Sequence, residues 1–490
     1  MSEWKKVKIG DICKIVKGTT GIASAEPGQY PLVVTAEERK TCSTYQFDCE
    51  AVCIPLVSSS GHGKKSLKNV HYQSGKFALG TILCAVIPNN PQELDARYLH
   101  QYLQFYKDII LVPLMKGAAN VSLSMKDIAT VEFPLPPIER QRELSNLFVS
   151  LQEKQKELSA EDEKQTEYAK LLRQNILQQA IEGKLTADWR KQNPVQKGNP
   201  DYDAEALFEQ IQKGEVSPSL PSQVAPRIAT ASSADSLRFV GLSATPSPRG
   251  KAPKTPDNSR EFFEEKLDSE RKRTNNARSK SIAPITDEEK PFEIPEGWKW
   301  VRLGEICNSI TDGDHLPPPK QNNGIPFIVI SDVSSGVIDF KGNRYVPESY
   351  YEKLQSDKKP QKGDILYTVT GSYGISVFVN DLKFCVQRHI GIIKPFQQIK
   401  KFIYYFLQSP ICKKLADSVA WGVAVKTIPI KELRNFTVPL PPLKEQEEIV
   451  NKVETLLEKV TTLENQIQAR KSLSDKLIFG IIKENLEAEK

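Results

Sequence analysis

The sequence predicts an α+β protein in which two pseudo-symmetric mixed α/β domains are joined by two long antiparallel helices, a coiled-coil spacer. Two repeated segments support this fold. Trp4–Cys13 reads almost the same as Trp298–Cys307, and the proline-rich segment Pro134–Gln141 returns as Pro439–Gln446. A long helical pattern follows the proline-rich segment in both halves. Two copies of one domain-plus-helix unit give a chain built-in pseudo-two-fold symmetry, which suits a two-sided ligand.

The repeat divides the 490 residues into five predicted parts. They are a first domain over 1–137, a central long helix over 138–186, a flexible Pro/Ser-rich linker with one short helix over 187–290, a second domain over 291–442, and a C-terminal long helix over 443–490 that pairs with the central helix. The linker is predicted to be flexible because it combines weak hydrophobicity with many prolines and serines.

Shorter matches lie between the repeated segments. Lys76-Phe77 corresponds to Lys383-Phe384, and Gly117–Ile128 corresponds to Gly422–Leu433. Short β-branched runs alternate with Gly-, Ser- and Asn-containing turns, which is typical of a mixed domain. Identity between the matches is low. We therefore expect one scaffold with diverged loops, as for two copies that bind different versions of one ligand class.

Apolar residues recur at steps of four and three after each proline-rich segment, which predicts a heptad seam on each long helix. The predicted pairing residues are Leu144, Phe148, Leu151, Leu158, Ile449, Val453, Leu456, Val460, Leu463 and Ile467. Gln155 is a polar member of the first seam, and such a residue can set the register at some cost in stability. The alternative is two surface helices, each packed on its own domain.

Composition narrows the class of protein only a little. The net charge of +6 is compatible with nucleic-acid binding but is common among other proteins. The eight cysteines are scattered, which favours free thiols over a zinc site. The N-terminal residues lack the apolar core of a signal peptide, and no apolar run has the length of a membrane span. These features predict a cytoplasmic protein.

The chain offers no convincing catalytic constellation. Gly61–Ser66 departs from a phosphate-binding loop at its first glycine and after its lysine. Asp312–His315 could supply metal ligands, but it reads better as a polar turn. The carboxylates and lysine of Pro256–Lys266 have the order of a nuclease site, although they fall in the predicted linker. We predict no catalytic site and no bound metal, and keep a self-contained nuclease at Pro256–Lys266 as the enzyme alternative.

Both repeats instead carry loops with the residue types that read DNA. Arg, Lys, Asn and Gln suit base edges, while hydroxyls, lysines and glycine-rich backbone suit phosphates. The DNA-binding candidates are Thr35, Arg39, Lys40, Ser60, His62, Lys64, Lys65, Lys68, Thr311, Asp312, His315, Lys320, Thr370, Ser372, Tyr373 and Arg388. Each of these residues could also be an ordinary solvated loop side chain, and the whole chain could be a coiled-coil adaptor for proteins.

The chain resembles the specificity subunit of type I restriction–modification systems. The segments that carry the resemblance are Glu296–Ile306, Thr311–His315, Gly363–Gly371 and Pro439–Gln446, together with Leu172–Leu185, which is similar to the end of that family's central helix. Their combination is specific, and the resemblance covers nearly the whole chain apart from the linker.

The resemblance implies that each domain is a target recognition domain that reads one half of a bipartite double-stranded DNA sequence. It implies that the paired helices set the gap between the halves and bind two modification methyltransferase subunits. S-adenosylmethionine would belong to the methyltransferase, where the target base is flipped, and ATP and Mg²⁺ to restriction/translocase subunits. The chain itself would hold no cofactor and no catalytic site.

Overall fold

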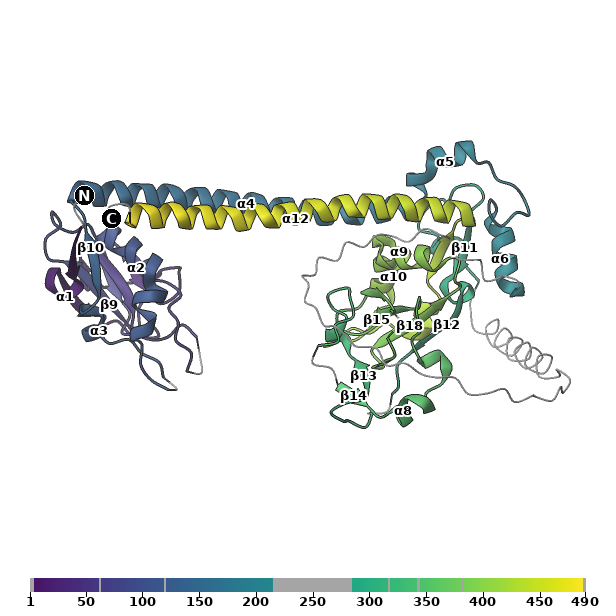
Figure 1. Ribbon diagram of the computed structural model, residues 1–490, viewed down its shortest axis with the longest axis horizontal. Coiled ribbons are helices and arrows are strands. Elements are labelled where there is room, and N and C mark those ends of the chain that lie inside the picture. The colour runs from purple at the N-terminus through teal and green to yellow at the C-terminus, as the bar shows by residue number, and fades with distance from the viewer. Residues whose placement is uncertain are drawn as a thin grey trace, which may run out of the picture. The chain divides into compact units, whose positions relative to one another are not determined.

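The computed structural model describes residues 4–60, 63–118, 120–214, 284–315, 318–341, 344–380 and 382–487. The chain divides into two compact units (Figure 1). Unit 1 comprises residues 1–167 with 464–490, and unit 2 comprises residues 168–463. Each unit therefore contains one of the repeated domains and one stretch of each long helix.

Unit 1 contains three small sheets. Its domain elements are β1 (Lys5–Lys8), α1 (Ile9–Ile12), β2 (Cys13–Lys17), β3 (Tyr30–Val33), β4 (Lys40–Cys42), β5 (Phe47–Asp48), β6 (Ala51–Pro55), β7 (His71–Gln73), β8 (Lys76–Leu79), β9 (Leu83–Pro88), α2 (Ala96–Ile110), η1 (Val112–Leu114), α3 (Met125–Ala129) and β10 (Glu132–Leu135). One sheet has the order β2-β9-β6-β7, a second has the order β4-β3-β8-β5, and β1 pairs with β10. Strands β3 and β8 are parallel, and the other neighbours in these sheets are antiparallel.

Unit 2 repeats this plan with different loops. Its domain elements are η3 (Asp287–Glu289), β11 (Lys299–Arg302), η4 (Leu303–Ile306), β12 (Cys307–Asp312), β13 (Ile325–Ile328), η5 (Ile330–Asp332), β14 (Arg344–Val346), α8 (Glu348–Lys353), η6 (Ser356–Lys358), β15 (Ile365–Thr368), β16 (Ser376–Phe378), β17 (Cys385–Val386), β18 (Ile390–Pro395), α9 (Lys400–Gln408), α10 (Pro410–Val419), α11 (Ile430–Arg434) and β19 (Thr437–Leu440). The sheet orders are β12-β18-β15-β16, β14-β13-β17 and β11-β19, and β13 is parallel to β17.

The predicted pseudo-symmetry is confirmed by these strand orders. Every strand of the β12-β18-β15-β16 sheet matches one of the β2-β9-β6-β7 sheet in both order and direction. The parallel pair β3–β8 likewise matches β13–β17. Strand β5 has no counterpart in the described part of unit 2.

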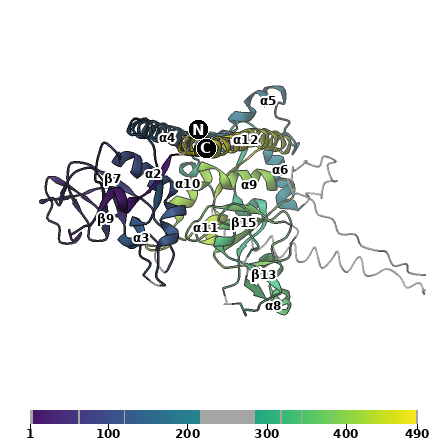
Figure 2. The same cartoon turned by 60° about the vertical axis from the view of Figure 1, so that its left-hand side comes forward.

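Each core forms where the domain helix covers the sheet. Strand β6 is buried along its whole length, which explains why its sequence is an unbroken apolar run. Asp95 caps the N-terminus of helix α2, and its carboxylate accepts hydrogen bonds from the Arg97 and Tyr98 amides. Tyr98, Leu99 and Leu103 are buried on the inner face of this helix. In unit 2, strand β15 is buried throughout, and α9 lies along the same sheet (Figure 2).

The two long helices are α4 (Ile138–Ile181) and α12 (Leu443–Glu487), and they pair antiparallel (Figure 1). In unit 1, the Gln155 amide donates to Asp475 at 3.0 Å, and Arg470 forms an ion pair with buried Asp162. In unit 2, Arg173 donates to Thr461 at 3.1 Å. Residue numbers fall on one helix as they rise on the other, and the antiparallel prediction is confirmed.

Two of the predicted pairing residues do not lie in the seam. Leu158 is 36% exposed and Leu463 is 41% exposed, whereas the other eight are buried or half-buried. On α4 the buried face continues from Gln155 through Ser159 to Asp162, so it takes a step of four where the heptad takes three. A straight helix has 3.6 residues per turn and drifts away from a 3.5-residue repeat, which is the physical reason for the error.

The start of the predicted linker is packed rather than loose. Helices α5 (Ala187–Gln192) and α6 (Ala204–Lys213) follow α4, and both lie inside the range predicted as a linker with one short helix. Leu207 and Ile211 of α6 are buried in the core of unit 2. Their apolar spacing anchors this segment, so the predicted flexible stretch began too early. Residues 215–283, including the Pro256–Lys266 carboxylates, lie outside the described residues.

Candidate nucleic-acid interface

The candidate loops occupy equivalent places in the two units. One joins β6 to β7 and the other joins β15 to β16, so each connects an inner strand to an edge strand. A short hairpin lies beside each loop. Hairpin 1 is Lys116–Ser122, of which Ala119 is not described, and hairpin 2 is Trp421–Thr427. The two loops therefore correspond in the strand topology.

Both hairpins depend on a glycine at the same position. Gly117 has φ +123° and Gly422 has φ +122°, a backbone conformation that L side chains rarely adopt. A Cβ added at Gly117 would lie 2.3 Å from the carbonyl oxygen of Asn120, and one added at Gly422 would lie 2.3 Å from that of Val425. The repeated glycine thus has a backbone cause in both units.

In unit 1, the β6–β7 loop is closed by its own serines. The Ser59 amide donates to the Ser66 carbonyl at 2.9 Å, and the hydroxyls of Ser60 and Ser66 lie 2.7 Å apart. The candidate lysines of this loop are all exposed, and they are Lys64, Lys65 and Lys68. His62 lies outside the described residues. The loop has the composition of a phosphate-contacting element, with three cations on a short closed turn.

Arg39 is engaged by strand β7. Its Nε donates to Gln73 at 3.1 Å, its Nη2 donates to the Tyr72 carbonyl at 3.3 Å, and its Nη1 lies 3.2 Å from Nδ1 of His71. Burial, followed by the charge of Arg39, lowers the pKa of His71 to about 4, so this histidine is neutral near pH 7 and can accept. These contacts favour a supporting role for Arg39. Beside it, Thr35 is half-buried and Lys40 is exposed.

In unit 2, the candidates at the end of β12 make contacts with one another and with the fold. The Thr311 hydroxyl donates to the Asp357 carbonyl at 3.0 Å, so this hydroxyl stabilises the domain by joining two of its segments. His315 Nε2 lies 2.9 Å from an Asp312 carboxylate oxygen. Lys320 is exposed. The Asp312–His315 pair orients an imidazole that is largely open to solvent.

A chain of hydroxyls and imidazole joins the β15–β16 loop to hairpin 2. Thr370 Oγ1 lies 3.1 Å from Nδ1 of His389 and accepts from the Thr427 hydroxyl at 3.3 Å. Burial, then the nearby Arg388 and His315, lowers the pKa of His389, which keeps its ring neutral near pH 7. Thr370, predicted from its loop position, is thus brought together with His389 and Arg388.

The other two candidates of this loop differ in their contacts with the rest of the domain. Ser372 is exposed. The Tyr373 hydroxyl donates to Asp417 at 2.7 Å, and Lys413 Nζ lies 3.9 Å from the centroid of the Tyr373 ring. Tyr373 is therefore held by α10, and its ring face already carries a cation.

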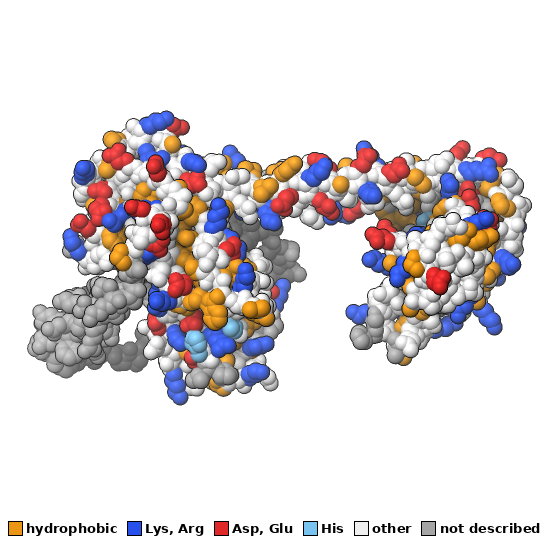
Figure 3. Space-filling model, turned by 180° about the vertical axis from the view of Figure 1, so that it is seen from behind, with side chains coloured by type: hydrophobic (Ala, Val, Ile, Leu, Met, Phe, Trp, Pro, Cys, Tyr) orange, Lys and Arg blue, Asp and Glu red, His pale blue; other side chains and the backbone are white. Residues whose placement is uncertain are grey.

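Next to His389, unit 2 has a cavity of about 360 Å³ with a mixed polar and apolar lining. Its polar and charged lining consists of Asp314, His315, Lys320, Arg344, Gln387, Arg388 and His389. Figure 3 shows histidine side chains next to Lys and Arg on this unit, with hydrophobic side chains beside them. Arg344 was not among the candidates, because it comes from β14 and reaches the cavity only through the pairing of β14 with β13.

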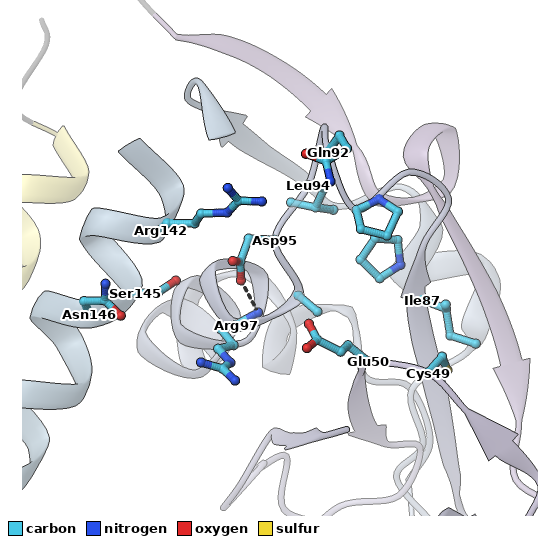
Figure 4. Close-up of a pocket in the computed structure, with 13 residues that line it drawn as sticks. Cys49, Glu50, Ile87, Gln92, Leu94, Asp95, Arg97, Arg142, Ser145 and Asn146 are labelled. Carbon is cyan, nitrogen blue, oxygen red and sulfur yellow. Dashed lines mark hydrogen bonds between the residues drawn. The ribbon is translucent and has the colours of Figure 1, made fainter. Parts of the chain in front are cut away.

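Unit 1 has a larger cavity of about 600 Å³ at the root of α4 (Figure 4). Its charged residues are Glu50, Asp95, Arg97 and Arg142, so neither sign of charge prevails. The Asp95 carboxylate accepts from the Arg97 amide at 2.7 Å, and it already caps α2. A cavity of about 380 Å³ lies at the matching junction of α9 and α12 in unit 2. None of the DNA-binding candidates lines either cavity.

Further apolar side chains are exposed along the long helices. On α4 these are Val149, Leu158, Tyr168, Leu171 and Leu172, and on α12 they are Leu463, Leu473, Leu477 and Phe479. Leu158 and Leu463 each lie 17 residues after the glutamine that ends the repeated proline-rich segment. Exposed apolar rows of this kind mark protein-binding surfaces.

Two searches of the described residues were negative. Within the ranges that the structure describes, no group of three or more His, Cys, Asp or Glu side chains could hold a metal ion. No helix within those ranges is both long and apolar enough to cross a membrane.

Comparison with known proteins identifies the family. The family model for the type I restriction modification DNA specificity domain matches residues 1–168 and 295–470. The Escherichia coli type I restriction enzyme EcoBI specificity subunit is 31% identical over 36% of this chain and 38% of its own length. The Escherichia coli EcoDI specificity subunit is 20% identical over 95% of this chain and 84% of its own length.

The chain matches little more than a third of the length of the EcoBI subunit, and the match to the Escherichia coli EcoAI specificity subunit covers 34% of that relative. A chain from a structural study of complex assembly and conformational transition of the type I R-M system has a TM-score of 0.60, with 16% identity over 100% of this chain and 99% of that chain. At this identity the likeness shows a common fold. Because the family model matches both repeats, the chain belongs to the type I restriction modification DNA specificity domain family.

Proposed function

We propose that this chain is the DNA sequence-specificity subunit of a type I restriction–modification complex. It reads a bipartite double-stranded DNA target with two target recognition domains, and it has no catalytic site of its own. The observation that carries the proposal is the family match to both repeats, which have the same strand order but different loop side chains. A shared scaffold with diverged loops is what two readers of different half-sites require.

The proposed DNA contacts are of two kinds. Lys64, Lys65 and Lys68 in unit 1, with Lys320 and Arg388 in unit 2, are exposed cations that suit phosphates. Candidates near bases are Thr35, Arg39, His62, Asp312, His315, Ser372 and Tyr373. For Arg39 and Tyr373 the observed contacts with β7 and α10 favour positioning of neighbouring side chains.

The long helices are the proposed scaffold for the partner subunits. The exposed leucines Leu158 and Leu463 occupy the same place in the two repeats, so each suits one of two modification methyltransferase subunits. S-adenosylmethionine would be held by those subunits, and ATP and Mg²⁺ by restriction/translocase subunits. The complex would work in the cytoplasm.

The test is a selection experiment with the full chain and its methyltransferase partner. A duplex library would carry two randomised blocks at several spacings, and binding would be measured over a series of salt concentrations. We expect enrichment of two short sequences at one spacing, with affinity that falls as salt rises. A double variant, Lys64→Ala with Lys65→Ala, should weaken binding to all sequences alike and reduce the salt slope by about 2.

An absence of enrichment at every salt concentration would contradict the proposal. Such a result would favour an adaptor that binds proteins through its coiled coil. Enrichment of both blocks without a preferred spacing would retain the two readers and remove the spacer role of the helices.

A further inference from the structure

Hairpin 2 presents apolar side chains to solvent. Trp421 is 67% exposed, Val423 is fully exposed at 108%, and Val425 is 56% exposed. These side chains contribute little to the core of unit 2, so their apolar character has no explanation in folding. A group of exposed apolar side chains on one short element marks a binding surface.

The backbone holds this apolar tip in place. Trp421 and Thr427 exchange backbone hydrogen bonds of 3.1 and 2.8 Å, and the Gly371 amide donates to the Lys426 carbonyl at 2.9 Å. The Ile428 amide donates to the Val369 carbonyl at 2.8 Å. Hairpin 2 is therefore fastened to the loop that follows strand β15, and its apolar side chains are presented at a set position.

The surroundings of hairpin 2 point to nucleic acid as the occupant. Thr427 and Thr370 link the hairpin to His389. Arg388, the residue before His389, is exposed, and so is Lys426 on the hairpin itself. Cations and hydroxyls around the hairpin can bind the phosphates of a nucleic-acid backbone. They would find no partner on an apolar protein surface or in the apolar part of a lipid. In the major groove, the apolar group that a base offers is the 5-methyl of thymine.

We propose that hairpin 2 contacts bases of the half-site read by unit 2, and that Val423 and Val425 select thymine by packing against its 5-methyl group. This inference rests on the proposed function and adds a base preference to it. Hairpin 1 supplies the contrast within the same chain. Its described residues include Lys116, Ala118 and Asn120 but no exposed branched apolar side chain, so it does not carry this preference.

Replacing thymine by uracil isolates the methyl group. The selected bipartite duplex would be prepared with deoxyuridine at each thymine position in turn, and bound by the full chain with its methyltransferase partner. At thymines that hairpin 2 contacts, we expect about fourfold weaker binding, the value for one buried methyl group. The double variant Val423→Ser with Val425→Ser should bind the thymine and uracil duplexes equally. Both valines are exposed, so the variant should fold normally.

Val337→Ser is the matched control, because Val337 is 62% exposed in the same unit but lies outside hairpin 2. It should keep the fourfold discrimination. The inference is overturned if uracil is tolerated at every position of that half-site by the unaltered chain. It is also overturned if discrimination survives in the Val423/Val425 variant. In both cases, continued selection of a bipartite target leaves the proposed function standing, whereas loss of all sequence selection would refute the proposed function itself.

Discussion

Hairpin 1 and hairpin 2 have the same backbone and different surfaces. Each has a glycine at φ near +120°, each is closed by reciprocal backbone hydrogen bonds, and each lies beside the loop that leaves an inner strand. Hairpin 1 bears Lys116 and Asn120, whereas hairpin 2 bears Trp421, Val423 and Val425. Because the backbone is determined by the glycine and by main-chain bonds, the exposed side chains are free to change. One scaffold can therefore serve two ligand sequences.

Glu445 and Arg140 occupy equivalent positions in the two proline-rich segments, but only Glu445 is buried. Glu445 of unit 2 is buried, and it accepts from Trp298 Nε1 at 2.7 Å, from the Thr186 hydroxyl at 2.6 Å, and from Arg190. The matching residue of unit 1 is Arg140, which bonds Glu143 and Asn485 near the surface. Glu445 anchors the segment that follows α4, and this anchor is specific to unit 2 within the described residues.

The largest expected effect is at this pair. Glu445→Ala leaves Arg190 and Trp298 Nε1 without their buried partner, so it should destabilise unit 2 by about 3–5 kcal/mol. Arg140→Ala, the matched control, should cost less than about 1 kcal/mol because its ion pair with Glu143 is exposed. Scanning calorimetry and hydrogen exchange of residues 184–192 would measure both. Equal losses in the two variants would contradict the assignment of a special anchor to unit 2.

The next effect concerns the backbone that the hairpins share. Gly422→Ala and Gly117→Ala each force a side chain into a left-handed conformation and against a carbonyl oxygen, at a cost of up to about 3 kcal/mol. We expect each variant to lose sequence selection in one block of the target only. If either substitution left its own hairpin and its selection unchanged, the backbone explanation would be wrong.

Low pH should destabilise unit 1 through a histidine on its edge strand β7, for which edge strand β16 of unit 2 has no titratable equivalent. The pKa of His71 in the folded chain is lowered from 6.5 to about 4, so the unfolded chain takes up a proton first as the pH falls. Stability should therefore be lost below about pH 6.5, by about 2 kcal/mol at pH 5. The equivalent residue of β16 is Val377, which is also buried but does not titrate. Denaturant unfolding at pH 7.5 and pH 5 would measure the loss, and His71→Gln should remove it.

The smallest effect on stability is expected on the long helices. Leu158→Ser and Leu463→Ser remove side chains that are only partly exposed, so each should lower the free energy of unfolding by about 1 kcal/mol. Each should nevertheless weaken binding of one methyltransferase subunit, which native mass spectrometry can count. Glu153→Ser is an exposed polar control on α4. Full assembly with both leucine variants combined would exclude these positions from the partner interface.

The repeated fold was predictable because its anchors are backbone requirements. The proline-rich segments and the glycines at 117 and 422 recur in the sequence for reasons that do not depend on the ligand. The pairing seam was predictable in most of its residues, but a 3.5-residue repeat cannot anticipate where a straight helix drifts. Leu158 and Leu463 were wrongly assigned to the seam for that reason.

The proposed DNA-reading surface was less predictable. Polar residue types were sought, so the valines of hairpin 2 were not among the candidates, and their exposure follows only from how Gly371 and Thr370 fasten the hairpin. Arg39 looked free in the sequence, yet β7, some 30 residues further along, engages its guanidinium. Contacts between distant segments decide which loop side chains are available, and no local pattern records them.

We propose that the two repeats read two half-sites independently. The most direct measurement is the two-block selection, run side by side on the unaltered chain and on a variant in which residues 421–427 are replaced by the sequence of residues 116–122. We expect one block to change its selected sequence while the other block and the spacing stay the same. Changes in both blocks, or in neither, would contradict the proposal.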